Sequence, residues 1–309
     1  MHKEYAVDPA TLASSWTTFL YLTEKFGFEK GRLISDFPPT KWANQVKVAA
    51  GPLADVEKKK LMEKLQSRRE MILAKTGRYF SVRATWLESA IFAHRSEPFH
   101  GIISDNSSQT HSSMVCSQDC QETHPLMCPL SGPVERTPEA LAAAARLLLV
   151  NSRRIKFVDP YFDLRGDRWL DVLKEFLDVV YQRGYANSQC EYHYGERDQG
   201  QTPVEFANSC GSRLRGIVPS GMTVTFVRWR QKSPGERLHA RYILTERGGL
   251  IFEGGLDRGG DGQTTDINLL DPAPLKMRWE AFNIASTVYE LIKPIVSVDS
   301  AGHVTEVNT

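Results

Sequence analysis

The sequence predicts an α/β protein in which a mainly helical N-terminal domain precedes a mixed β-sheet flanked by helices. Strand-like and helix-like runs alternate from residue 138 to 296, a pattern typical of a sheet covered by helices. Within this region, two strand-like runs joined by a Gly-Gly turn over 241–252 indicate a hairpin. We expect three parts: a helical domain (1–103), a polar Cys-containing linker or insert (104–137) and the α/β domain (138–309).

The bulk composition is that of a globular chain. Its 309 residues suit about two domains, and 41% hydrophobic with 24% charged residues are ordinary globular values. A net charge of +1 gives no global sign of a nucleic-acid-binding protein. No apolar run is long enough to span a membrane, and the first residues lack the apolar core of a signal peptide. We therefore expect a cytoplasmic protein.

The N-terminal domain is expected to be built from helices. Asp8-Pro9 has the residue types of a helix start, and a second helix is predicted over 53–75. Phe99 to Ile103 resembles a strand. Residues 57–83 hold nine basic and three acidic side chains. This cluster is either a solvated helix face or a surface for a phosphate backbone or an acidic partner.

The insert holds four residues of the types that bind zinc, Cys116, Cys120, His124 and Cys128. Each lies four residues after the last, which differs from the usual Cys-x2-Cys spacing. Two prolines would also break a helix through them. The alternative is a surface insert with incidental thiols. We predict no metal site and no cofactor.

The elements of the α/β domain are expected in a clear order. Thr137-Pro138 starts a buried helix to Val150. The later strands are expected at 155–162, 190–194, 222–229, 241–245, 250–252 and 266–270, and the later helices at 169–181, 204–214 and 279–291.

His239 and Arg241 lie two residues apart before and within the predicted strand, so their side chains share a face. Gly254 and Gly255 allow a backbone to approach closely. A guanidinium can fork onto a phosphate, and glycine amides can cradle it. The alternative is that His239 is a packed or hydrogen-bonded residue without a functional role.

This stretch resembles the signature of the phospholipase D superfamily, His-x-Lys, four residues, Asp, then Gly-Ser-x-Asn. The corresponding residues are His239, Arg241 in place of Lys, Glu246 in place of Asp, and Gly254-Gly255-Leu256-Asp257. It is closer to the phospholipase-D-like C-terminal domain of MIT-domain proteins and its bacterial relatives. That pattern is matched by His239-Ala240-Arg241, Gly248-Gly249, Gly255-Leu256-Asp257 and Thr265-Asp266.

The resemblance implies a phosphodiester site. In active members the His is the nucleophile, so the implied catalytic group is His239, Arg241, Glu246 and Asp257. The implied substrate-binding group is Gly254, Gly255, Asp266, Asp159 and Tyr161. Asp159 and Tyr161 are included because Asp-Pro-Tyr ends a strand expected beside that of Arg241; a plain strand end is the alternative. A second His, needed for the two-His chemistry, would come from elsewhere in the chain or from a homodimer partner.

The resemblance leaves two classes of function open. The first is recognition of a phosphodiester, in nucleic acid (DNA or RNA) rather than in a membrane lipid, because no amphipathic membrane helix is evident. Catalysis would then be that of a metal-independent phosphodiesterase or nuclease, with Arg241 in the place of the usual Lys. The bacterial relatives suggest a phage-defence system with a partner protein. The second is a scaffolding or membrane-binding module that has lost catalysis.

Overall fold

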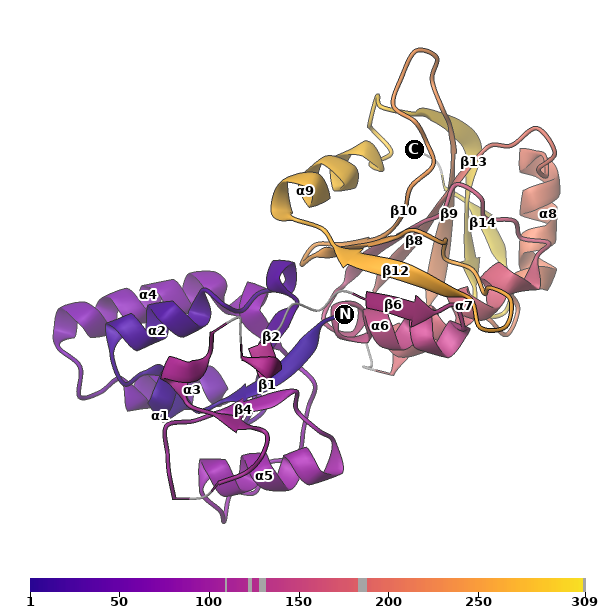
Figure 1. The fold of residues 1–309 in the computed structure, drawn as a ribbon. Coiled ribbons are helices and arrows are strands. Elements are labelled where there is room, and N and C mark those ends of the chain that lie inside the picture. Colours follow the sequence, from indigo (N-terminus) through magenta and orange to yellow (C-terminus); the bar gives the residue numbers. More distant parts are fainter. Residues whose placement is uncertain (109, 122–123, 128–131, 183–187, 308–309) are drawn as a thin grey trace. The chain divides into compact units, whose positions relative to one another are not determined.

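The computed structural model describes the chain except for residues 109, 122–123, 128–131, 183–187 and 308–309. It divides into two compact units, residues 2–130 and 131–309, with Met1 joining the second (Figure 1). Residues 104–137 are shared between the two units. Within the described part of the chain, no helix is both long and apolar enough to cross a bilayer.

The first unit is built around a five-stranded parallel sheet. Its strands are β1 (Lys3–Val7), β2 (Arg32–Ser35), β3 (Leu73–Ala74), β4 (Gly101–Ile103) and β5 (Met114–Val115), in the order β3-β2-β1-β4-β5. Its helices are α1 (Pro9–Leu12), α2 (Trp16–Thr23), η1 (Phe28–Lys30), α3 (Trp42–Ala49), α4 (Asp55–Ile72), α5 (Trp86–Ser96), η2 (Ser117–Asp119) and η3 (Pro125–Met127). Helices hold most of the regular residues of this unit, as predicted, but they cover a sheet that was not predicted from the sequence. The strands are short, and β1 and β2 are buried on both faces, so they show no period of two.

Both faces of this sheet are buried, as parallel sheets require. Along β1, Tyr5 and Val7 pack into a core with residues of α1 to α4, whereas Ala6 packs with residues of α5 on the other face. The predicted strand at Phe99 to Ile103 is confirmed as β4, and the helix predicted over 53–75 is confirmed as α4. The alternation in β1 thus places one helical layer on each side.

From β1 the chain adds β2 and β3 on one side of the sheet and then β4 and β5 on the other. The carboxyl ends of β1 and β4 therefore flank a topological switch point, where open α/β sheets bind ligands. Asp8 follows β1, and its carboxylate accepts hydrogen bonds from Ser104 Oγ and Ala10 N, both at 2.9 Å. Asp105 follows β4 and accepts from the Ser117 amide at 2.7 Å. The two carboxylates therefore stabilise the loops that follow β1 and β4.

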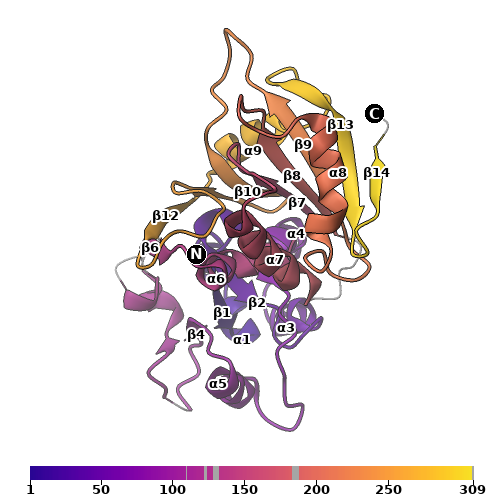
Figure 2. The ribbon, with the colours of Figure 1, turned by 90° about the vertical axis from the view of Figure 1, so that its right-hand side faces the viewer.

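The second unit contains a nine-stranded mixed sheet (Figure 2). Its strands are β6 (Gly132–Glu135), β7 (Arg154–Val158), β8 (Gln189–Gly195), β9 (Thr223–Arg230), β10 (Arg241–Thr245), β11 (Gly249–Phe252), β12 (Thr264–Leu269), β13 (Glu290–Asp299) and β14 (Val304–Glu306). The order is β14-β13-β9-β8-β7-β10-β11-β12-β6, and β7, β8 and β9 are parallel to one another. The remaining pairings are antiparallel.

Helices cover both faces of this sheet. They are α6 (Pro138–Val150), α7 (Asp167–Tyr181), α8 (Pro203–Leu214) and α9 (Pro272–Ala281). The α9 face includes Val158, Trp229 and Phe282 in one apolar cluster. The helix predicted over 279–291 is wrong at both ends, since the helix starts at Pro272 and Glu290 already belongs to β13. The α/β class of this unit is as predicted.

Arg78, one of the nine basic residues at 57–83, forms a buried ion pair with Glu4. Arg78 donates from Nη2 to Glu4 Oε2 at 2.7 Å, and both side chains are buried. Thr76 Oγ1 donates to the other carboxylate oxygen at 2.5 Å. Arg78 is therefore not part of a surface for nucleic acid.

We expect Arg78→Ala to lower the free energy of unfolding by about 3–5 kcal/mol, because the Glu4 carboxylate would stay buried without its cation. Equilibrium urea unfolding of the full chain measures this loss. The control is exposed Arg83→Ala, with an expected change within about 0.5 kcal/mol. Replacing both partners, Glu4→Leu with Arg78→Met, should recover much of the loss. Equal stabilities of Arg78→Ala and Arg83→Ala would contradict the role of the pair.

Candidate functional site

Arg241 lies at the start of β10, on the face of the sheet opposite α9. Its guanidinium carbon is 4.4 Å from the centroid of the Tyr161 ring. One Nη donates to the Glu253 carbonyl at 3.3 Å, and the buried Nε has no hydrogen-bond partner among the described residues. The side chain is thus positioned by a ring and a long hydrogen bond, and most of its donors remain available.

His239 precedes β10 rather than belonging to it. Its imidazole is exposed, and Nδ1 lies 3.4 Å from the Arg237 carbonyl oxygen. In the described part of the chain, no carboxylate is hydrogen-bonded to this ring. His239 is two residues from Arg241, but a single 3.4 Å contact does not hold the imidazole in one orientation.

Asp159 is the buried centre of the region, directly after β7. Its Oδ1 accepts from the Tyr161 amide at 2.9 Å, and its Oδ2 accepts from the Leu256 amide at 3.0 Å and from Trp169 Nε1 at 3.3 Å. Burial raises the pKa of Asp159, the two amide hydrogen bonds oppose this effect, and Asp257 and Arg241 act in opposite directions. Asp159 therefore joins the end of β7, the glycine corner and α7.

The glycine corner is tightly constrained. The Gly254 amide donates to Thr265 Oγ1 at 2.8 Å. Gly255 has φ +110°, a region that favours glycine, and a Cβ there would lie 2.4 Å from Asp257 Oδ1. The predicted close approach of backbone is therefore real, and its immediate neighbours are Thr265 and Asp257.

Two arginines, neither of them predicted as a site residue, form ion pairs with Asp257. Arg136, just after β6, is 2.5 Å from Oδ1, and Arg168, in the first turn of α7, is 3.1 Å from Oδ2. They come from segments far from Asp257 in the sequence, and neither has a motif around it. Asp257 is thus engaged in ion pairs and is not bonded to His239.

Two predicted site residues lie elsewhere. Glu246 follows the opposite end of β10, where its carboxylate accepts the Arg153 and Arg154 amides at 2.8 and 3.0 Å and supports the start of β7. Asp266 is exposed, and the register from Arg241 to Phe252 to Ile267 places its side chain on the opposite face of the sheet from Arg241. The prediction that Glu246 and Asp266 join Arg241 is wrong.

A second polar cluster lies on the α9 face of β7 and β8. Lys156 Nζ is 3.2 Å from Glu191 and donates to the Phe282 carbonyl at 2.6 Å. His193 Nε2 is 2.9 Å from Glu191, and Trp229 Nε1 donates to His193 Nδ1 at 2.9 Å. The parallel register of the two strands sets Lys156 against Glu191.

These hydrogen bonds define the protonation of the cluster. Because His193 Nδ1 accepts from Trp229, the ring is neutral and donates from Nε2 to Glu191. Burial lowers the pKa of His193, which favours the same state. Burial raises the pKa of Glu191, but its bonds to His193 and Lys156 outweigh burial and lower the pKa to about 2. Burial also lowers the pKa of Lys156.

The cysteine-containing segment shows no metal site in the part that is described. Cys116 is exposed and Cys120 is buried, and burial raises the pKa of the Cys120 thiol to about 12. Cys128 lies outside the described residues. Among the residues with described positions, no group of three or more His, Cys, Asp or Glu could hold a metal ion.

Comparison with known proteins gives no family for the chain. No family model matches it. No curated protein matches it. One solved structure that matches is that of TrmBL2, an archaeal chromatin protein described as showing a novel mode of DNA binding. It has 10% sequence identity and a TM-score of 0.27, covering 79% of this chain and 86% of that chain. A likeness with this TM-score carries no argument about fold or function.

We expect Gly255→Ala to destabilise the second unit by about 1–3 kcal/mol, because it combines a positive φ with a clash against Asp257. Thermal or urea unfolding measures the change. Gly260→Ala is the matched control in the same loop, since its Cβ would meet nothing closer than 3.6 Å. Similar stability of the two variants would show that the corner relaxes freely.

The low pKa of Glu191 predicts a pH dependence of stability. The folded state holds the pKa near 2, below the ordinary 4.5, so Glu191 stabilises the fold above pH 4.5 and loses this contribution as the pH falls towards 2. Glu191→Gln should lower the free energy of unfolding by about 1–2 kcal/mol at pH 7, because the neutral His193 contributes a hydrogen bond but no charge, and it should flatten the stability profile between those pH values. Urea unfolding across pH tests this, with exposed Glu280→Gln as control. An unchanged profile would contradict the assignment.

Proposed function

We propose that the second unit is a phosphodiester-recognising domain, similar to phospholipase-D-like domains, whose ligand is nucleic acid. The observation that carries the proposal is the placement of Arg241 against Tyr161. A guanidinium that stacks on an aromatic ring and keeps its donors available is preorganised to bind a phosphate in two hydrogen bonds. The 4.4 Å stack and the single 3.3 Å bond to Glu253 describe such a group.

Tyr161 favours nucleic acid as the source of the phosphate. Its side chain is 38% exposed although it is large and partly apolar. An exposed ring beside a cation can stack with a base while the arginine binds the adjoining phosphate, the usual arrangement for single strands.

The charges around Arg241 are compatible with an anion. Asp257 is already paired with Arg136 and Arg168. Burial raises the pKa of Asp159, which moves this carboxyl towards its neutral form. The two acids therefore oppose a phosphate less than their number suggests.

The contacts of His239 support binding without cleavage. A nucleophilic imidazole needs a partner that fixes its tautomer and orientation. His239 is exposed and its nearest polar contact is the 3.4 Å approach to the Arg237 carbonyl. Glu246, predicted as part of the catalytic group, is bonded to the start of β7 instead. A place in a phage-defence system remains a prediction from the resemblance.

We expect Arg241→Ala to weaken binding of a fluorescein-labelled single-stranded 20-mer DNA by about 10- to 100-fold, as for loss of a charge-assisted hydrogen bond. The slope of log affinity against log salt should fall by about one. Fluorescence anisotropy at several salt concentrations measures both. The melting temperature should barely move, because the only hydrogen bond lost within the described protein is the long one to Glu253.

Arg215→Ala is the matched control, since Arg215 also donates to one backbone carbonyl, that of Ala301, and lies at the end of α8. Equal affinities of the Arg241→Ala and Arg215→Ala variants would refute the site. His239→Ala separates the two chemistries, because a binder loses only affinity and an enzyme loses turnover of a chromogenic phosphodiester. Flotation with anionic liposomes without DNA binding would favour the alternative of a membrane-binding module.

A further inference from the structure

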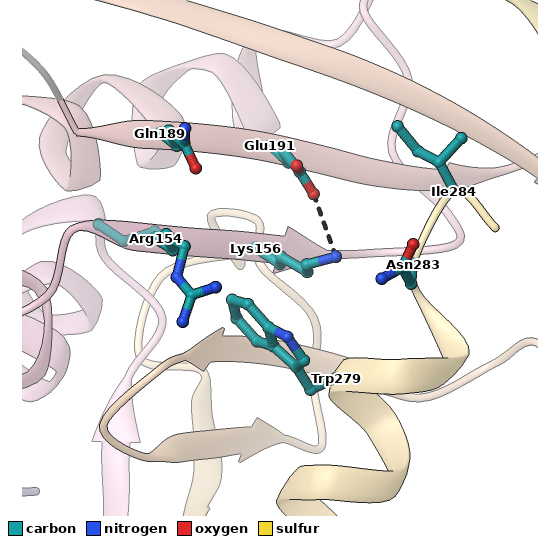
Figure 3. Close-up of a pocket in the computed structure, with 8 residues that line it drawn as sticks. Arg154, Lys156, Gln189, Glu191, Trp279, Asn283 and Ile284 are labelled. Carbon is teal, nitrogen blue, oxygen red and sulfur yellow. Dashed lines mark ion pairs between the residues drawn. The ribbon is translucent and has the colours of Figure 1, made fainter. Parts of the chain in front are cut away.

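A hollow of about 180 Å³ opens between α9 and strands β7 and β8. Figure 3 shows its polar lining, in which Lys156 points towards Glu191 and Arg154 lies beside the indole of Trp279. The lining is completed by Ile155, Gln189, Asn283 and Ile284. It lies on the opposite face of the sheet from Arg241, as the register of β7 with β10 requires.

The two cations of the hollow are not balanced by its acids. Glu191 is its one lining carboxylate among the described residues, and it is already bonded to Lys156 and His193. Arg154 has an exposed side chain and makes no ion pair with a described carboxylate. The hollow therefore carries an excess of one positive charge.

Both cations lie near the Trp279 ring, and Lys156 is also fixed by further contacts. The Arg154 guanidinium carbon and Lys156 Nζ lie 5.4 and 4.9 Å from the Trp279 ring centroid. Lys156 is further fixed by Phe282 and Glu191, and these two contacts leave one of its three N–H donors for another acceptor. Because folding already restricts Lys156, binding a ligand there would cost little additional side-chain entropy.

We propose that this hollow binds a phosphomonoester. A terminal phosphate is close to a dianion at neutral pH and offers three acceptor oxygens, which suits a guanidinium, an ammonium donor and neighbouring carboxamides. Gln189 and Asn283 supply the carboxamides, and both are exposed at the rim. The phosphate is either that of a free nucleotide or the phosphorylated end of a strand. This site does not depend on Arg241, so it goes beyond the function proposed above.

The test uses the full chain and four probes in calorimetric titrations: inorganic phosphate, AMP, and a DNA 8-mer with a 5′-phosphate or a 5′-hydroxyl. Arg154→Ala should weaken binding of the phosphomonoester probes at least tenfold, while Arg215→Ala leaves it unchanged. The affinity of the wild-type chain for AMP should fall as the pH drops through about 6, where the dianion gains a proton. Arg154 is the residue to change first, because Lys156 also holds the end of α9.

The outcomes separate this site from the Arg241 site. Tight binding of AMP indicates a free nucleotide, and a preference for the 5′-phosphorylated 8-mer over AMP indicates a strand end. Arg241→Ala should weaken the 8-mers and leave inorganic phosphate and AMP unaffected. The proposal is overturned if none of the phosphomonoester probes binds the wild-type chain, or if Arg154→Ala binds them as the wild-type chain does.

Discussion

The hydrogen bonds of one buried carboxylate, Asp159, hold the candidate site together. Its two oxygens accept from Tyr161, Leu256 and Trp169, which belong to three different segments. A buried carboxylate without such donors would cost several kcal/mol. The contact with the Tyr161 amide fixes the turn that sets the ring under Arg241. The contact with the Leu256 amide fixes the glycine corner in which Asp257 meets its arginines.

Most of the second unit could be predicted from the sequence because its strands are long or strongly apolar. The runs at 222–229 and 241–245 show the expected patterns and occur as β9 and β10. The last helix was predicted too late in the chain. Trp279 to Leu291 contains helix-forming residues, but the helix starts at Pro272 and ends at Ala281. The sheet of the first unit could not be predicted, because β3 and β5 have two residues each and β1 and β2 are buried on both faces, so none of them shows an alternating pattern.

The site residues that could be predicted are those whose pattern is local in the sequence. Arg241 and the glycine corner are local features, and a two-residue spacing or a Gly-Gly pair is visible in the sequence. Arg136 and Arg168 are 121 and 89 positions from Asp257 in the sequence. No motif lies near either arginine, so pairing over such distances could not be predicted. Glu246 occupies a motif position in the sequence, but it lies at the far end of β10 and supports the start of β7. Asp266 is close to the glycine corner in sequence, but the alternation of β12 directs its side chain to the other face of the sheet.

The pairing of β6 with β12 has a consequence for how the second unit is made. The first strand of this unit, Gly132–Glu135, pairs among the described strands with Thr264–Leu269 alone, so it has no place in the sheet until β12 has left the ribosome. Closing so long a stretch of chain also makes this pairing one of the slower steps of folding. Arg136 follows β6 directly, so the pairing of β6 with β12 helps to place it beside Asp257. A nascent chain that stops short of β12 contains Arg241, Tyr161 and Asp257, but it lacks the strand against which β6 holds Arg136.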